Sequence, residues 1–244
     1  MIKLIVFDVY KTILHVGPSR SVSDEEWNGL WNRFFLDELP PLTYAGFKEA
    51  TRDLIQSDHA KAEIVGVHSP EVFWDDLVIR VLPRLKELNL STQKYFFYKQ
   101  IQLEREVGLM RGAGEGLAEL KQTGILLGVA SNAQGYTFRE LDLCLGEAGM
   151  DRSLFHSDFC CWSFLNGFSK PNSHVFRILT AKASYAGIQP GEILMVGDRI
   201  DNDIQPAEKQ GWQTWHLNAQ TEPSTYRGGD WEELMQFIKG QIFQ

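Results

Sequence analysis

Cysteine is scarce in this sequence of 244 residues. The three cysteines, Cys144, Cys160 and Cys161, are an odd number, and none of them forms a C-x-x-C pair. A disulfide framework and a cysteine-rich zinc site are therefore not expected. We expect the protein to occupy a reducing compartment, the cytoplasm. Cys160 and Cys161 stand at a predicted strand end, and we interpret them as small buried hydrophobic residues and not as nucleophiles.

Long apolar runs are also missing. The apolar run near the start, residues 2–7, is interrupted by Lys3 and broken by Asp8, which makes it too short for the core of a signal peptide. No stretch approaches the roughly 20 apolar residues that a membrane span needs. We therefore expect a soluble cytoplasmic protein without a membrane partner.

Positive charge is in deficit. The chain carries 24 Lys and Arg against 32 Asp and Glu, a formal net charge of −8. An acidic surface repels phosphate backbones, so non-specific nucleic-acid binding is not expected. The content of 43% hydrophobic and 23% charged residues is close to that of soluble globular proteins, which excludes a disordered or low-complexity chain.

What the sequence does contain is an alternation of strand and helix patterns. Four short apolar segments are typical of buried strands, namely residues 2–7, 125–130, 193–196 and, more weakly, 213–217. Amphipathic helical patterns alternate with the later ones, over residues 116–122, 136–145, 171–185 and 204–210. This alternation predicts an α/β fold, a doubly wound parallel sheet with helices on both faces.

Residues 21–107 have a different pattern, which is helical throughout and contains no convincing strand. Ser23 and Glu26 form a capping-box signature at the start of the first of these helices. The simplest architecture is a Rossmann-like core of residues 1–15 and 110–244, interrupted after its first strand by an all-helical cap of residues 16–109. We interpret the aromatic residues of this segment mostly as cap core; they are Trp27, Trp31, Phe34, Phe35, Phe73, Trp74, Tyr95, Phe96, Phe97 and Tyr98.

Polar residues follow the predicted strands, at the positions where a sheet of this kind binds its ligands. In such sheets ligands bind beyond the carboxyl ends of the strands. The polar residues expected at that edge are Asp8, Ser131, Asn132, Lys170, Asp198 and Asp203. Lys170 is included because it directly precedes Pro171, which can start a helix and leave the lysine in the loop. Singly, Asp8 is explained as a strand end in a turn, and Asp198 and Asp203 as helix caps. Ser131 with Asn132 is more often a helix cap than a phosphate ligand, and Lys170 alone is most often a solvated loop residue.

As a set, these residue types are suited to hydrolysis. A carboxylate such as Asp8 can act as a nucleophile that splits the reaction into two steps through a covalent intermediate. The carboxylate oxygens of Asp8, Asp198 and Asp203 are hard ligands of the kind that Mg²⁺ prefers. Ser131 and Lys170 can then neutralise negative charge on the transferred group.

The order and spacing of these residues resemble the haloacid dehalogenase superfamily of hydrolases. The first motif of that family, Asp-x-Asp-x-Thr, is matched by Asp8 and Thr12, and the second, a Ser or Thr that closes the next strand, by Ser131. The third motif, a lysine, is matched by Lys170, and the fourth, Gly-Asp-x-x-x-Asn-Asp, by residues 197–203. The helical insert lies where that family carries a C1-type cap.

The resemblance implies a role for each matched residue. Asp8 is the expected nucleophile, and Lys170 is expected to orient it. The substrate is expected to bind at Thr12, Ser131, Asn132 and Lys170. The expected Mg²⁺ ligands are Asp8, the backbone carbonyl of Tyr10, Asp198 and Asp203. On this basis the protein is expected to be a Mg²⁺-dependent hydrolase of a small phosphorylated metabolite that forms an aspartyl-phosphate on Asp8.

One catalytic position departs from the pattern of the family's phosphatases. They carry a second Asp two residues after the nucleophile, as the acid for the leaving group and then the base for water. Here that residue is Tyr10, a phenol whose pKa of ~10 keeps it neutral at pH 7. Losing such acid–base help lowers a rate by about 10² to 10⁴, so a slow phosphatase is expected. Lys11 also departs from the pattern, because a small or acidic residue is more usual there.

Two other functions stay open at this point. A tyrosine at residue 10 is familiar from the 2-haloacid dehalogenase branch, in which halide leaves without protonation. That branch uses no magnesium, however, and its fourth motif lacks the acidic pair Asp198 and Asp203. A catalytically impaired binding or regulatory member is the third interpretation, for which Tyr10 and Lys11 are the evidence. The acidic pair, whose members repel one another without a cation, favours the metal-dependent phosphatase.

Overall fold

The computed structural model of the chain describes residues 1–67, 70–217 and 225–242. It contains a six-stranded sheet with the order β5-β4-β1-β6-β7-β8, in which every neighbouring pair is parallel. The strands are β1 (Leu4–Phe7), β4 (Leu126–Ser131), β5 (Cys160–Trp162), β6 (Ile193–Gly197), β7 (Gln213–Leu217) and β8 (Gly228–Gly229).

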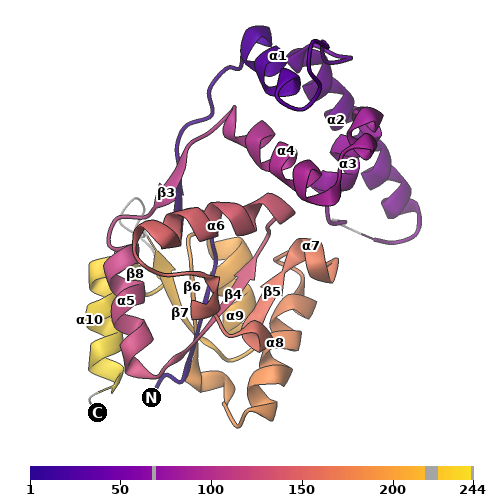
Figure 1. Cartoon of the computed structure of the whole chain (residues 1–244). Coiled ribbons are helices and arrows are strands. Elements are labelled where there is room, and N and C mark those ends of the chain that lie inside the picture. The colour runs from indigo at the N-terminus through magenta and orange to yellow at the C-terminus, as the bar shows by residue number, and fades with distance from the viewer. Residues whose placement is uncertain (68–69, 218–224, 243–244) are drawn as a thin grey trace. The chain divides into compact units, whose positions relative to one another are not determined.

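Helices cover both faces of this sheet (Figure 1). On one face Phe176 of α8 (Ser173–Tyr185) and Ala207 of α9 (Gln205–Glu208) join Val6 of β1 in a buried cluster. On the other face Trp231 of α10 (Trp231–Ile242) stacks on Phe7, the next residue of β1. The remaining elements of this region are α5 (Ala113–Thr123), α6 (Gly135–Glu147), α7 (Ser163–Asn166), η2 (Arg152–Leu154), η3 (Ser157–Phe159), η4 (Pro190–Glu192) and η5 (Ile200–Ile204). The predicted doubly wound α/β fold is confirmed.

The position of β1 in the sheet explains why its sequence, LIVF, is uniformly apolar. All four of its residues are buried, because strands lie on both sides of it and helices cover both faces. Burying aliphatic side chains of this size stabilises a fold by about 1.5–3 kcal/mol each. Phe7 pairs with Val129 of β4 and with Val196 of β6, so the residues that follow these three strands meet at one edge.

The four predicted strands correspond to β1, β4, β6 and β7. Of the two edge strands, β5 was expected only as a strand end at Cys160 and Cys161, and β8 was not predicted. With three and two residues, the edge strands are too short to produce a readable pattern. The sequence pattern also missed a small antiparallel pair, β2 (Leu14–Val16) with β3 (Val107–Leu109), at the two ends of the helical insert.

The chain divides into two compact units. One comprises Met1–Val16, Val107–Ala133 and Leu141–Gln244, and the other Gly17–Glu106 and Gln134–Glu140. The second unit has the helical character that the sequence predicts, and no strand lies in its described part. Its helices are α1 (Asp24–Asn32), α2 (Tyr44–Ile64), α3 (Trp74–Val81), η1 (Pro83–Glu87) and α4 (Leu90–Gln102). Residues 134–140, at the start of α6, also belong to this unit.

The helical unit has a core of its own, built largely from aromatic rings. The predicted capping box is present at the start of α1, where Ser23 Oγ accepts from the backbone of Glu26 and Glu26 accepts from the backbone of Ser23. The core cluster includes the buried rings of Trp27, Trp31, Tyr44, Phe47 and Phe96. Three of the expected core rings lie outside it: Phe73 is 51% and Tyr95 38% exposed, and Tyr98 is buried but does not belong to the cluster.

A helix that crosses a bilayer needs about 20 predominantly apolar residues. No helix within residues 1–67, 70–217 and 225–242 is both long and apolar enough to do so.

Candidate active site

Asp8 is the first residue after β1. Its backbone N–H donates to the carbonyl of Val196 in the neighbouring strand β6 at 2.9 Å, which fixes its place at the edge of the sheet. The chain then turns tightly, since the backbone N–H groups of Ile13 and Leu14 both donate to the carbonyl of Val9. The turn brings Thr12 Oγ1 to 3.5 Å from Asp8 Oδ2.

Lys170 links Asp8 to the acidic loop that follows β6. Its Nζ donates to Asp8 Oδ1 at 2.7 Å and to Asp203 Oδ1 at 2.5 Å, and its side chain is only 3% exposed. The Asn132 side chain holds the backbone of Lys170 on both sides, donating to its carbonyl at 2.8 Å and accepting from its N–H at 2.6 Å. Burial works to lower the pKa of the Lys170 ammonium, but the attraction of Asp203 and Asp8 outweighs it and raises that pKa.

The loop after β6 carries the other two carboxylates. Asp203 lies in η5, and its Oδ2 accepts from the backbone N–H of Arg199 at 3.1 Å. Gly197 permits this approach, because a Cβ at residue 197 would lie 2.4 Å from the Asp203 carboxyl group. The backbone carbonyl of Asp198 lies 3.0 Å from His216 Nε2 at the neighbouring β7.

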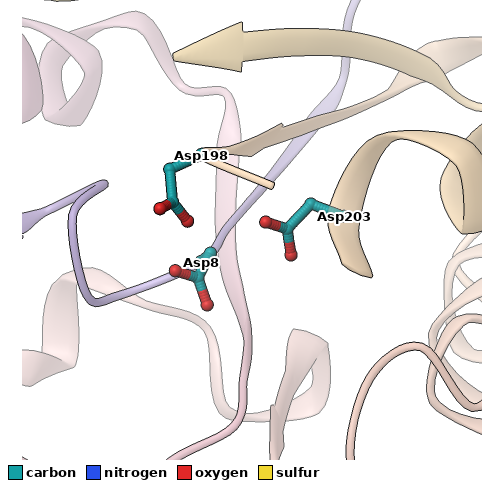
Figure 2. Close-up of side chains that lie close together, drawn as sticks. All are labelled: Asp8, Asp198 and Asp203. Atoms are coloured by element: carbon teal, nitrogen blue, oxygen red, sulfur yellow. The ribbon is translucent and has the colours of Figure 1, made fainter. Parts of the chain in front are cut away.

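Asp8, Asp198 and Asp203 face one another at this edge (Figure 2). Each offers one carboxylate oxygen, and the three oxygens lie within 4.8 Å of one another. Burial, and then the negative charge of Asp203, raise the pKa of the Asp198 carboxyl. Burial also raises the pKa of Asp203, against the attraction of Lys170. The three carboxylates therefore carry more negative charge than Lys170 alone neutralises, and their hard oxygen atoms fit a divalent cation such as Mg²⁺.

A pocket of about 210 Å³ opens onto these groups. Its lining residues all belong to the unit that contains the sheet; they are Asp8, Tyr10, Lys11, Asn132, Lys170, Asp198, Arg199, Asn202 and Asp203. The size of the pocket suits a small group such as a phosphoryl group, because sites for drug-sized ligands have volumes of about 300–1,000 Å³.

Two of the predicted substrate-binding residues, Thr12 and Ser131, are not part of the lining of this pocket. Thr12 is fully buried, and Ser131 is 2% exposed at the end of β4. The hydroxyl of Ser131 has no hydrogen-bond partner among the described residues, which is unusual for a buried polar group and suggests a bound partner. Asn132 lines the pocket, but both ends of its amide are engaged with the backbone of Lys170.

Two groups that support this site were not found from the sequence. His216 contacts the carbonyl of Asp198, and Trp231 Nε1 donates to the carbonyl of Thr12 at 2.8 Å. Both act through backbone carbonyls, which any residue could offer, so no motif marks them.

Comparisons of the sequence with known proteins match it to hydrolases. A family model described as haloacid dehalogenase-like hydrolase matches residues 2–211. An uncharacterized hydrolase of Schizosaccharomyces pombe is 24% identical over 225 residues, which are 90% of this chain and 92% of that protein.

Solved structures with the same fold include a 2-haloacid dehalogenase from Pseudomonas syringae, with a TM-score of 0.63 and 18% identity over 99% of this chain and 100% of that one. A HAD phosphatase from Thermococcus onnurineus has a TM-score of 0.52 and 16% identity, covering 98% of this chain and 99% of its own. A magnesium-bound HAD hydrolase from Bacillus subtilis has a TM-score of 0.52 and 19% identity, covering 97% and 98%. At these identities the likeness concerns the fold.

Proposed function

The chain belongs to the haloacid dehalogenase-like hydrolases, and we propose that within this family it is a Mg²⁺-dependent phosphatase that uses Asp8 as its nucleophile. The observation that carries the proposal is the cluster of Asp8, Asp198 and Asp203, with one oxygen of each within 4.8 Å of the others. Two of these carboxyl groups have raised pKa values, so the cluster favours a bound cation over three free negative charges.

The charges around the pocket favour a phosphoryl group as the ligand. Three carboxylates line the pocket together with three cationic side chains, those of Lys11, Lys170 and Arg199, so the formal charges of the lining cancel. A divalent ion would leave an excess of two positive charges, which is complementary to the dianion of a phosphate monoester. The carboxylate of a 2-haloacid carries only one negative charge.

In the proposed reaction, an Asp8 oxygen attacks phosphorus and the leaving group departs from the opposite side. Lys170 keeps the carboxylate oriented through its 2.7 Å bond to Oδ1, and the Asn132 side chain keeps Lys170 in place. We assign Ser131 Oγ, together with Thr12, to binding of the phosphoryl oxygens, because that buried hydroxyl lacks a partner among the described residues.

The metal would be held by Asp8, Asp198 and Asp203, with the backbone carbonyl of Tyr10. It would supply positive charge that balances the phosphoryl oxygens. The magnesium-bound Bacillus subtilis hydrolase of the same fold supports this choice of ion. With Tyr10 in place of an acidic residue, we expect slow turnover.

A second candidate is displacement of halide from a 2-haloacid by Asp8. Tyr10 favours it, since a halide leaves without protonation, and the Pseudomonas syringae protein of similar fold is a 2-haloacid dehalogenase. Asp198 and Asp203 disfavour it, because without a metal these two carboxylates would repel the nucleophile Asp8 and one another.

We propose that residues 16–109 form a C1-type cap that sets substrate specificity, and that residues 1–15 and 110–244 form the catalytic core. The separate aromatic cluster of the helical unit supports this division. We further propose that the protein acts in the cytoplasm, because its three cysteines are all unpaired thiols.

The test is to measure phosphate release from a panel of phosphate compounds, and chloride release from 2-chloropropionate, each with Mg²⁺ and with EDTA. We expect phosphate release that EDTA abolishes. The Asp203→Asn variant should lose most of this activity and Asp201→Asn should keep it, because Asp201 lies in the same loop but is exposed and paired with Arg199. Chloride release that is indifferent to EDTA would support the dehalogenase. If neither phosphate nor chloride is released although the protein still binds metal, the protein has a binding or regulatory role.

A further inference from the structure

The described lining of the pocket has no spare carboxylic acid to protonate a leaving group. Among its described lining residues the only carboxyl groups are Asp8, Asp198 and Asp203, which the proposed function assigns to attack and to the metal. Tyr10 takes the place of an acidic residue. Esters of ordinary alcohols, whose leaving groups need a proton, are therefore poor substrates for this site.

The same pocket does offer a cation beside Tyr10. Lys11 is exposed, lines the pocket, and stands close enough to the acidic loop to act on the Asp198 carboxyl by electrostatic attraction. Its backbone has a φ of 60°, and only one other described non-glycine residue, Asp37, has a positive φ. Such a conformation is strained for lysine and free of strain for glycine, so the fold alone does not call for lysine here. Strain of this kind is characteristic of functional positions.

We propose that Lys11 binds the negative charge of the leaving group, and that the substrate is a phosphoric anhydride whose leaving group departs as an anion without taking up a proton. This inference rests on the proposed phosphatase function and deepens it. Two kinds of phosphoric anhydride have such a leaving group. In an acyl phosphate the leaving group is a carboxylate, and in a diphosphate it is a second phosphate.

The first step is balanced without an acid. An Asp8 carboxylate oxygen forms a bond to phosphorus, and the bond from phosphorus to the bridging oxygen breaks. The bridging oxygen keeps the electron pair and leaves as a carboxylate or phosphate anion beside Lys11. In the second step water forms a bond to phosphorus and the Asp8–phosphorus bond breaks. The electron pair returns to Asp8, and the proton of the water goes to the departing phosphate or to solvent.

The test compares kcat/KM with Mg²⁺ for acetyl phosphate, inorganic pyrophosphate and glycerol phosphate, after subtracting spontaneous hydrolysis. For the wild type we expect one of the two anhydrides to exceed glycerol phosphate by about 10²-fold or more, the lower end of the contribution of an acid to a reaction that needs one. Whichever of the two anhydrides is preferred identifies the source of the leaving group.

Three variants separate binding of the leaving group from a general effect. Lys11→Met should lower kcat/KM for the preferred anhydride by about 10-fold or more beyond any loss for glycerol phosphate, which is the scale of a lost hydrogen bond to a charged group. Lys11→Arg should retain most of the anhydride activity. Lys3→Met, which removes the same charge at the opposite end of β1 where Lys3 pairs with Glu192, should behave as the wild type. The melting temperatures of all variants are measured alongside.

The outcomes distinguish the two levels of the proposal. If no phosphate is released from any of the three compounds, the phosphatase function itself is wrong. If phosphate is released but glycerol phosphate is hydrolysed as fast as both anhydrides, or Lys11→Met slows all substrates equally, the inference about Lys11 is overturned and the phosphatase function stands.

Discussion

The indole N–H of Trp231 donates a 2.8 Å hydrogen bond to the backbone carbonyl of Thr12, across 219 positions of the chain. The same ring stacks on Phe7 with the planes 13° apart. Gly116 makes this packing possible, because a Cβ at residue 116 would lie 2.7 Å from the indole ring. The C-terminal helix α10, beyond the residues that the family model matches, thus holds the turn that follows Asp8.

Replacing Trp231 by Phe should therefore impair both catalysis and the stability of the fold. The variant keeps an aromatic ring on Phe7 but leaves the buried carbonyl of Thr12 without its donor, which costs about 1–3 kcal/mol of unfolding free energy. Because the turn carries Asp8, we expect kcat to fall about tenfold, equivalent to roughly 1.4 kcal/mol, with KM little changed. Steady-state kinetics and urea unfolding measure the two effects.

Trp215→Phe is the matched control for this variant. Trp215 is equally buried and also stacks on a phenylalanine, but its indole N–H has no hydrogen-bond partner among the described residues. We expect wild-type kcat for Trp215→Phe. Equal losses of kcat in the two tryptophan variants would contradict the positioning role of Trp231.

Tyr10→Asp should restore acid–base help. We expect hydrolysis of glycerol phosphate to rise by about 10²-fold, because a positioned carboxyl group contributes about 10² to 10⁴ to such reactions. The preference for an anhydride should shrink by the same factor. Tyr10→Asn, which is similar in size to the aspartate but has no proton to give, serves as the control. If the aspartate and asparagine variants have the same rates, the missing acid does not limit this enzyme.

Lys11→Gly should separate the needs of the fold from those of the reaction. The backbone φ of 60° at residue 11 suits glycine, while the extra freedom of glycine in the unfolded chain opposes the gain, so the unfolding free energy should change by less than about 1 kcal/mol. Hydrolysis of the preferred anhydride should fall as in Lys11→Met. A large loss of stability, found by denaturant unfolding, would show instead that the lysine serves the fold.

The cysteines should be slow to react in the native protein. Burial raises the pKa of the Cys160 thiol to about 11 and also raises that of Cys161. At pH 8 such a thiol has about 10²-fold less thiolate than free cysteine of pKa ~8.5. Its higher intrinsic nucleophilicity recovers about half of that difference on a logarithmic scale.

We therefore expect iodoacetamide to label native Cys160 about tenfold or more slowly than free cysteine, with a rate that rises as the pH is increased toward 11. Unfolding in urea should make all three thiols react rapidly, which is the internal control. A native thiol that is labelled as fast as free cysteine would contradict this assignment and reopen the question of the nucleophile.

The sequence was informative where a local pattern has one structural meaning. The apolar run before Asp8 must be a central strand, and the motif residues 197–203 must follow another, so their meeting at one edge follows from the parallel sheet. Parts without such a pattern were missed, including β8 and α10. Asn132 illustrates the limit for single residues, since its side chain holds the backbone of Lys170, a contact that depends on tertiary structure and has no sequence signal.

The most direct test of the account is to capture the intermediate on Asp8. The enzyme is mixed with its preferred phosphate compound and Mg²⁺, quenched in acid within the first turnover and analysed by peptide mass spectrometry. We predict an added mass of one phosphoryl group on the peptide that contains Asp8, absent with EDTA and absent from Asp8→Asn. Phosphate release by the wild type with no such label on Asp8, or with the label on another residue, would contradict the proposed mechanism.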